Sequence, residues 1–137
     1  MALVPFAAER PLAGVASLCR AEGWPSYGDP AVLLRAFAAP GVIAVVAVVE
    51  DAGDAPPGEA GTAHAEGVVG VAQAQGDGAV QSHLSLLVVA PHARRRGVGR
   101  RLVEEVLRGT GTRRMDLLAE AAAGPFYERF AHRRMAG

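Results

Sequence analysis

The sequence contains no lysine: all fourteen of its basic residues are arginine, and fourteen acidic residues balance them. This absence excludes a Walker-type phosphate loop, a Schiff-base enzyme and a lysine general base. The single cysteine, Cys19, excludes an internal disulfide and every multi-cysteine metal site, and it is typical of a reducing compartment. The four histidines have no partner at metal-ligand spacing, so no metal site is expected.

Long apolar runs are also missing. The longest, residues 42–49, falls well short of the ~18 residues that indicate a membrane span. The N-terminal stretch has no basic residues before its apolar part and is interrupted by Pro5 and Glu9, unlike a signal peptide. We therefore expect a soluble, cytoplasmic protein. At 137 residues and 50% hydrophobic content, the chain predicts one domain, residues 1–137, that folds around its own core.

Helical periodicity marks two segments in the first third of the chain, residues 10–22 and 31–38. Asp29 is the expected N-cap of the second helix, with Pro30 at its first position. Residues 42–49 are apolar throughout and rich in valine, which is typical of a strand buried on both faces. We therefore expect this strand to be central in a sheet.

The order of elements predicts an α/β fold. A short strand over residues 3–6 precedes the two helices, and residues 50–66 lack any period and predict a mobile surface loop. The later elements are a hairpin of strands 67–74 and 79–89, a helix from Gly97 closed by Gly109, a strand over 115–119 and a helix over 125–130. This order predicts a mixed central sheet, in which an antiparallel meander leads into one β-α-β crossover.

Three successive arginines, residues 94–96, stand at the N-terminus of the helix that begins at Gly97. Positive charge there opposes the helix dipole by ~0.3–1 kcal/mol per site. A bound phosphate would reverse that effect, because helix N–H groups, glycines and arginines would all face the anion. The alternative is a solvated arginine cluster beside turn glycines. A dinucleotide fingerprint is excluded, because its third glycine position is Leu102.

Two segments carry a resemblance to a known family. Arg94-Arg-Arg-Gly-Val-Gly99 resembles the R/Q-x-x-G-x-G/A acetyl-CoA pyrophosphate loop of the GCN5-related N-acetyltransferases (GNAT), and residues 87–91 resemble the strand end before it. Phe126-Tyr-Glu-Arg129 resembles the family's second signature, F-Y-E-K/R. The resemblance extends in motifs from Ala79 to Phe130 and in element order over the whole chain. It implies a single-domain GNAT-like fold with helices on both faces of the sheet.

The resemblance also implies site residues. Backbone groups of three strand residues would pair with the pantetheine arm of acetyl-CoA, and the loop would hold its pyrophosphate. Tyr127 corresponds to the tyrosine that protonates the departing thiolate in many members, although an ordinary core tyrosine is the alternative. The cofactor-binding residues implied are Leu87, Val88, Val89, Arg94, Arg95, Arg96, Gly97, Val98, Gly99 and Arg100.

Acetyl transfer to an amine needs the neutral amine. Deprotonating an alkyl ammonium of pKa ~10.4 at pH 7 costs about 4.6 kcal/mol, so a base or a chain of water molecules is expected. His83 lies an even number of residues before Leu87, on the same side of a regular strand, where several family members place a Glu or His base. A histidine facing solvent or satisfied in the core is the alternative. His64, His92 and His132 are assigned no chemistry.

The acceptor site is expected beside the first two helices. Trp24, Tyr27 and Asp29 would suit a cationic amine through aromatic faces and a carboxylate, whereas a packed turn around the tryptophan is the alternative. Two departures from the family are Glu120, in place of a common asparagine, and Ala131-His132, in place of Gly-Phe. A final strand that is missing or truncated would leave an open edge that invites a second copy, so a homodimer stays open.

These residues predict an acyltransferase that uses acetyl-CoA as co-substrate, without a metal, and transfers the acetyl group directly to a primary amine of a small molecule or peptide. Cys19 lies on a helix face, so a covalent acetyl-enzyme is not expected. The alternative is a non-catalytic acyl-CoA-binding or sensor module of the same fold. Nucleic-acid and membrane partners are not expected, because the net charge is zero and only 5% of residues are aromatic.

Overall fold

The computed structural model describes residues 1–6, 11–49, 64–119 and 121–133. Within them, five strands form one mixed sheet in the order β1-β2-β3-β4-β5. The first four strands pair antiparallel, and β5 pairs parallel to β4, so the predicted meander and crossover are confirmed. The strands are β1 (Ala2–Pro5), β2 (Val42–Val48), β3 (Val68–Gly76), β4 (Gln81–Val89) and β5 (Arg114–Asp116).

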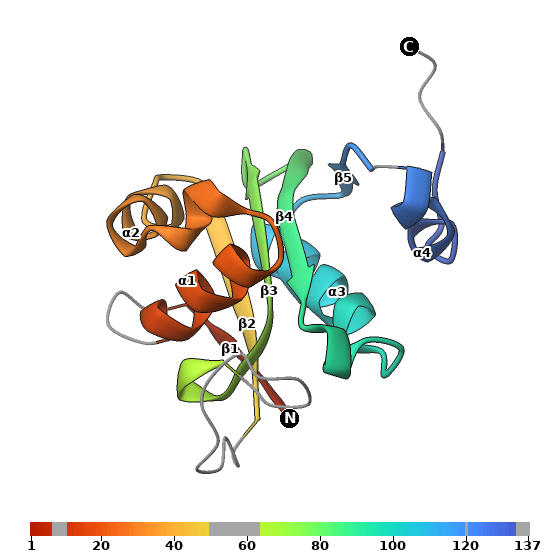
Figure 1. The fold of residues 1–137 in the computed structure, drawn as a ribbon. Helices are drawn as coiled ribbons and strands as arrows, with labels where there is room; N and C mark the ends of the chain where they lie inside the picture. Colours follow the sequence, from red (N-terminus) through yellow and green to blue (C-terminus); the bar gives the residue numbers. More distant parts are fainter. Residues whose placement is uncertain (7–10, 50–63, 120, 134–137) are drawn as a thin grey trace.

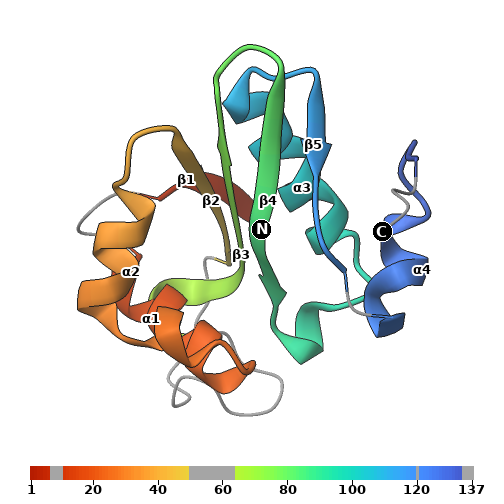
Figure 2. The ribbon, with the colours of Figure 1, turned by 90° about the horizontal axis from the view of Figure 1, so that it is seen from above.

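Helices cover both faces of the sheet, as the resemblance implied (Figures 1 and 2). Helices α1 and α2 lie on one face and α3 on the other, while the short α4 lies beyond β5 on the α3 side. Asp29 caps α2 as predicted, because its Oδ1 accepts from the backbone N–H of Ala31 at 2.9 Å. The helices are α1 (Leu12–Ala21), α2 (Pro30–Phe37), α3 (Val98–Thr110) and α4 (Gly124–Tyr127).

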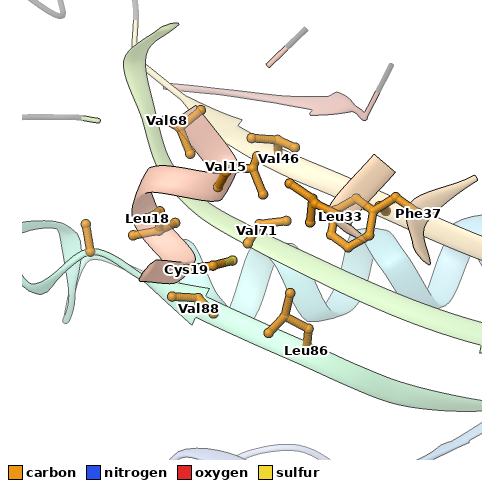
Figure 3. Close-up of a cluster of buried hydrophobic side chains, with 13 residues drawn as sticks. Val15, Leu18, Cys19, Leu33, Phe37, Val46, Val68, Val71, Leu86 and Val88 are labelled. Atoms are coloured by element: carbon orange, nitrogen blue, oxygen red, sulfur yellow. The ribbon is translucent and has the colours of Figure 1, made fainter. Parts of the chain in front are cut away.

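The face covered by α1 and α2 buries one hydrophobic cluster (Figure 3). Leu18 and Leu33 of the helices are fully buried against strand residues that include Val46, Val71 and Leu86. Cys19 is buried in the same cluster, where burial raises the pKa of its thiol to about 12. The thiol therefore stays protonated at neutral pH, as expected for a packing residue rather than a nucleophile.

The other face buries the apolar stripe of α3. Its members are Val98, Leu102, Val103 and Val106, which pack on residues of β2, β3 and β4. The last residue of α3 is Thr110, and Gly111, with a φ of 68°, is its C-cap. The helix therefore does not end at the predicted Gly109. A Cβ at position 109 would lie 2.8 Å from Cγ2 of Ile43, so Gly109 instead lets α3 approach β2 closely.

Three further expectations differ from the structure. The valine-rich strand β2 is interior, but the middle position of the sheet belongs to β3. Most of the predicted loop, residues 50–63, lies outside the described residues, whereas its end is ordered around the buried His64. The predicted strand over residues 115–119 is shorter, because the chain leaves the β4 ladder after Asp116.

Strand β4 contains a β-bulge that changes which way its side chains point. Gln73 of β3 pairs with Leu86 and Ala74 pairs with Leu84, so Ser85 is an extra residue in β4. Leu84 consequently belongs to the cluster beneath α3, whereas Leu86 belongs to the cluster beneath α1 and α2. An extra residue breaks the period-2 alternation of a strand. The expectation that His83 and Leu87 share a side is therefore wrong.

Candidate active site

A groove opens where β4 and β5 diverge. Their parallel ladder covers three residue pairs and ends at His83↔Asp116, after which the two segments separate. The groove has a volume of about 500 Å³. Residues 84–87 of β4 form one wall, residues 117–119 face them, and residues 22–24 at the end of α1 contribute a third side, together with Ala123 and Tyr127.

The groove-facing edge of β4 has no strand partner beyond His83 among the described residues. Backbone N–H and C=O groups on such an edge are available to an extended ligand, which can add to the sheet as another strand does. Leu87, Val88 and Val89, the residues predicted to bind pantetheine, lie on this free stretch. At its end, the carbonyl of Val89 accepts from Nε of Arg94 at 3.1 Å.

The predicted phosphate loop connects β4 to α3. Arg95 and Gly97 have φ values of 63° and 79°, so the backbone twice enters the left-handed region before the helix begins. Gly97 is the N-cap residue and provides no side-chain cap, which leaves the first-turn N–H groups of α3 without a side-chain partner. Apart from Gly97 and its two chain neighbours, no atom of the described residues lies within 4 Å of where a Cβ of Gly97 would be. This open, uncapped helix N-terminus is suited to an anion.

The arginines of the loop differ in their surroundings. Arg94 is tied to Glu22, whose Oε1 lies 2.7 Å from its guanidinium, and Arg100 pairs with Glu104 at 2.9 Å. The Arg100 guanidinium also lies 5.8 Å from the ring centroid of Phe130. Within the described part of the chain, Arg95 and Arg96 are exposed and have no ion-pair partner. These two side chains are therefore the ones immediately available to phosphate.

Helix α4 places Tyr127 in the groove wall. The ring of Phe126 packs against Gly99 in the first turn of α3. The contact is close, since a Cβ at position 99 would lie only 3.1 Å from the ring. The rings of Phe126 and Tyr127 make an edge contact with centroids 4.8 Å apart. Burial raises the pKa of the Tyr127 phenol above its usual range, so the hydroxyl is protonated at neutral pH and can donate a proton.

His83 lies at the closed end of the groove rather than in its wall. Its Nδ1 is 2.5 Å from Oδ1 of Asp116, and both side chains line a neighbouring hollow of about 290 Å³. The bulge turns His83 toward the face that α1 and α2 cover, while Tyr127 packs with the cluster on the α3 face. The structure thus places the two predicted catalytic residues on opposite sides of the sheet.

The expected acceptor residues are not brought together. Trp24 lines the groove and is 40% exposed. Tyr27 instead packs between Trp24 and Phe37, with ring centroids 6.2 Å from each. Asp29 is occupied as the cap of α2. Of the three, Trp24 alone reaches the groove, because the turn folds Tyr27 inward and places Asp29 at the start of the next helix.

Two pairs at the site were missed by sequence reasoning. Glu22 and Arg94 are 72 residues apart, and their ion pair joins the end of α1 to the phosphate loop. His64 was expected in a loop, but it is buried and its Nδ1 lies 2.7 Å from Oγ of Ser17. Burial lowers the pKa of His64. No local pattern in the sequence indicates either pair, because each joins segments that only the fold brings together.

The described residues contain no group of three or more His, Cys, Asp and Glu side chains placed to hold a metal ion. Among the same residues, no helix is both long enough and apolar enough to cross a membrane. Glu120, the departure from the family's asparagine, lies outside the described residues.

The chain is similar to known acetyltransferases in sequence and in structure. The family described as "Acetyltransferase (GNAT) domain" matches residues 43–131, well over half of the chain. No curated protein matches this chain. Solved structures do: a protein assigned as an acetyltransferase from Deinococcus radiodurans R1 is 25% identical, with a TM-score of 0.74 over 99% of this chain and 84% of that one.

Two further structures share the fold at lower identity. An acetyltransferase from Trypanosoma brucei is 19% identical, with a TM-score of 0.68 over 99% of this chain and 96% of that one. AAC(6')-Iy, in complex with the bisubstrate analogue CoA-S-monomethyl-acetylneamine, is 18% identical, with a TM-score of 0.72 over 99% and 92%. The chain belongs to the GNAT family of acetyltransferases, as its two motifs predicted, and is an acyltransferase.

Proposed function

We propose that residues 1–137 form one acetyltransferase domain that transfers the acetyl group of acetyl-CoA directly to a primary amine. The observation that carries this proposal is the groove between β4 and β5. A free strand edge leads along it to the uncapped N-terminus of α3, and Tyr127 stands in its wall. One extended ligand with a pyrophosphate can use all three features at once.

The residues present fit acetyl-CoA as the co-substrate. Leu87, Val88 and Val89 offer backbone groups to the pantetheine arm. The pyrophosphate would accept from the first-turn N–H groups of Val98, Gly99 and Arg100, with the side chains of two exposed arginines around it. Those arginines are Arg95 and Arg96, and Arg94 joins them when its pair with Glu22 opens.

Tyr127 is the proton donor to the leaving thiolate in this proposal. Attack by the amine nitrogen forms the C–N bond, and the C–S bond then breaks to release the thiolate. An ordinary phenol of pKa ~10 would give its proton to a thiolate of pKa ~8.5 modestly uphill, and the raised pKa of Tyr127 makes this transfer more uphill. In return, the phenol holds its proton at neutral pH until the thiolate forms.

His83 is the proposed base, and a chain of water molecules is the alternative. His83 faces the α1 and α2 side, whereas Tyr127 lies on the α3 side. The base acts on the amine nitrogen and the acid on the thioester sulfur, so the two groups can lie on different sides of the reacting carbon. Direct transfer is therefore compatible with these two positions.

The acceptor is proposed as a primary amine on a small molecule or peptide. Trp24 offers an exposed aromatic face to a cationic group, and Glu22 supplies a carboxylate in the same wall. Structures of this fold include aminoglycoside 6'-N-acetyltransferases, one of them complexed with coenzyme A. Neamine, spermidine and the dipeptide alanylglycine therefore make a suitable first panel of amines.

Calorimetric titration with acetyl-CoA tests the proposal, using Gly97→Glu against Gly78→Glu as a matched control. Both glycines have a left-handed φ near 78° and open space where a Cβ would be, but Gly78 lies in the β3–β4 turn. We expect micromolar binding that Gly97→Glu weakens at least ten-fold, since it adds bulk and negative charge at the phosphate loop, and that Gly78→Glu preserves.

Thiol release with the amine panel completes this experiment. Absence of acetyl-CoA binding by the folded wild-type protein would overturn the proposal. Binding without acetylation of any amine would favour the alternative, a non-catalytic acyl-CoA-binding module of the same fold. Equal losses in the two glycine variants would show that backbone strain, and not the loop, is responsible.

A further inference from the structure

We propose that Asp116 is the positioning residue of His83: it holds the histidine in the tautomer that leaves Nε2 free to take a proton from the acceptor amine. This inference rests on the proposed acetyl transfer and names a second residue for it. Sequence reasoning did not single out Asp116, which lies 33 residues after His83 and comes from a different strand.

The fold places this pair where the two strands part. His83↔Asp116 is the last pair of the parallel β4–β5 ladder, and the groove walls begin with the next residues, Leu84 and Leu117. The pair therefore marks the closed end of the groove. Its side chains are 42% and 60% exposed, so solvent and an amine can reach both.

The short contact determines the proton positions. An ionised carboxylate only accepts hydrogen bonds, so the 2.5 Å contact with Oδ1 of Asp116 requires that Nδ1 of His83 carries the proton. In a neutral imidazole the other nitrogen, Nε2, then has the free lone pair. A base needs that lone pair, and Asp116 also stabilises the imidazolium that forms when Nε2 is protonated.

The neighbouring polar groups are engaged elsewhere. Gln75 of β3, the residue that pairs with His83 of β4, donates to Oγ of Ser85 at 3.2 Å. Asp77 at the rim of the hollow accepts from the backbone N–H groups of Ala79 and Val80 at 2.8 and 2.7 Å. Arg114 of β5 donates to Oε1 of Gln81. Among the described carboxylates, Asp116 is the one in ion-pair contact with His83.

The proton balance of the step is complete. The amine nitrogen forms a bond to the acetyl carbon and gives one proton to Nε2 of His83, while the C–S bond breaks and the sulfur takes the proton of the Tyr127 hydroxyl. The products are the N-acetylated amine and CoA thiol. The proton on His83 returns through solvent to the Tyr127 phenolate, which restores both groups for the next turnover.

The tautomer of His83 can be measured without any acceptor. In long-range ¹H–¹⁵N correlation spectra of the ¹⁵N-labelled full chain above pH 8, we expect His83 in the Nδ1–H form. Asp116→Asn should shift it toward the Nε2–H form, because an amide NH₂ can donate to Nδ1. Asp77→Asn is the matched control: it removes a carboxylate from the same hollow and should leave the His83 signals unchanged.

Kinetics supply the second readout, with the amine of the neamine, spermidine and alanylglycine panel that reacts fastest. We expect Asp116→Asn to lower kcat/KM ten-fold or more, as part of the ~10²–10⁴-fold that a positioned base contributes. Exposed ion pairs add little stability, so Tm should stay unchanged.

The outcomes separate this inference from the proposed function. His83 in the Nε2–H form in the wild-type protein, or a tautomer that Asp116→Asn leaves unaltered, would overturn the positioning role. So would acetylation with an unchanged kcat/KM in Asp116→Asn. Failure of acetyl-CoA to bind would overturn the proposed function instead, and the tautomer of His83 would still report whether Asp116 controls it.

Discussion

Tyr127 is one of two tyrosines in the chain, and the two occupy different surroundings. Tyr127 lines the groove, whereas Tyr27 packs between Trp24 and Phe37. Burial raises the pKa of both phenols, so burial alone does not distinguish them. Their positions distinguish them. Removing the hydroxyl of Tyr127 or of Tyr27 therefore gives two matched variants that differ in the position of the lost group.

We expect Tyr127→Phe to lower kcat by ~10²–10⁴-fold, because a positioned general acid contributes that much, with acetyl-CoA affinity nearly unchanged. Tyr27→Phe should retain the wild-type kcat. Because burial raises the pKa of Tyr127, any loss of activity from its deprotonation should begin at a higher pH than for an ordinary tyrosine, whose pKa is ~10. Steady-state thiol release against pH measures both effects. An unchanged kcat in Tyr127→Phe would remove Tyr127 from the acid role.

At this scale, sequence reasoning could propose a site only where its residues are contiguous. The predicted phosphate loop lies within Arg94–Gly99, and its glycines and arginines indicate it without knowledge of the fold. Side-chain partners could not be found in this way. Asp116 meets His83, and Glu22 meets Arg94, only because strands and helices distant in sequence converge. No spacing rule applies to such pairs.

Among the elements, β4 differs from the regular strand that its sequence predicts, because it contains a β-bulge. A regular strand would place His83 and Leu87 on one side, but the extra residue Ser85 reverses the alternation between them. In the structure, buried and partly buried residues alternate without interruption through the bulge, because helices cover both faces of the sheet. The hairpin turn signal predicted the strand, but no pattern in the sequence reveals the change of face.

Helix α2 owes its start to Asp29, which the sequence also placed near the acceptor. We expect Asp29→Ala to lower the free energy of unfolding by about 1 kcal/mol, since Ala31 loses its side-chain acceptor. Asp29→Ser retains a capping hydroxyl and should be close to wild type in urea denaturation. Both variants should keep the wild-type KM for the amine. A raised KM in both would instead show that the carboxylate contacts the acceptor.

At the scale of the whole molecule, one ion pair joins the end of α1 to the predicted phosphate loop that leads into α3. Glu22 follows α1 on one face of the sheet, and Arg94 belongs to the connection that leads to α3 on the other. Glu22 is the more buried partner, with 18% of its side chain exposed against 56% for Arg94. In the absence of ligand this pair occupies an arginine that phosphate could use.

We therefore expect Glu22→Gln to tighten CoA binding about two- to five-fold, since an ion pair of this kind is worth up to ~1 kcal/mol and the released Arg94 gains a new anionic partner. Glu105→Gln is the matched control, because it removes the same charge from a pair with Arg108 on α3. Calorimetry at low and high salt measures the difference. Equal or weaker binding by Glu22→Gln would show that Arg94 takes no part in holding CoA.

The contact between α4 and the first turn of α3 carries a thermodynamic consequence. Gly99 and Arg100 belong to the turn that would hold the pyrophosphate. Phe126 packs against Gly99, and the Arg100 guanidinium lies over the ring of Phe130, so this turn also holds the segment that carries Tyr127. Binding free energies are reciprocal, so a ligand that orders this turn also favours the seated position of α4. Acetyl-CoA would then favour the position of α4 that places Tyr127 in the groove, and any ligand that holds α4 in that position would tighten acetyl-CoA binding in return.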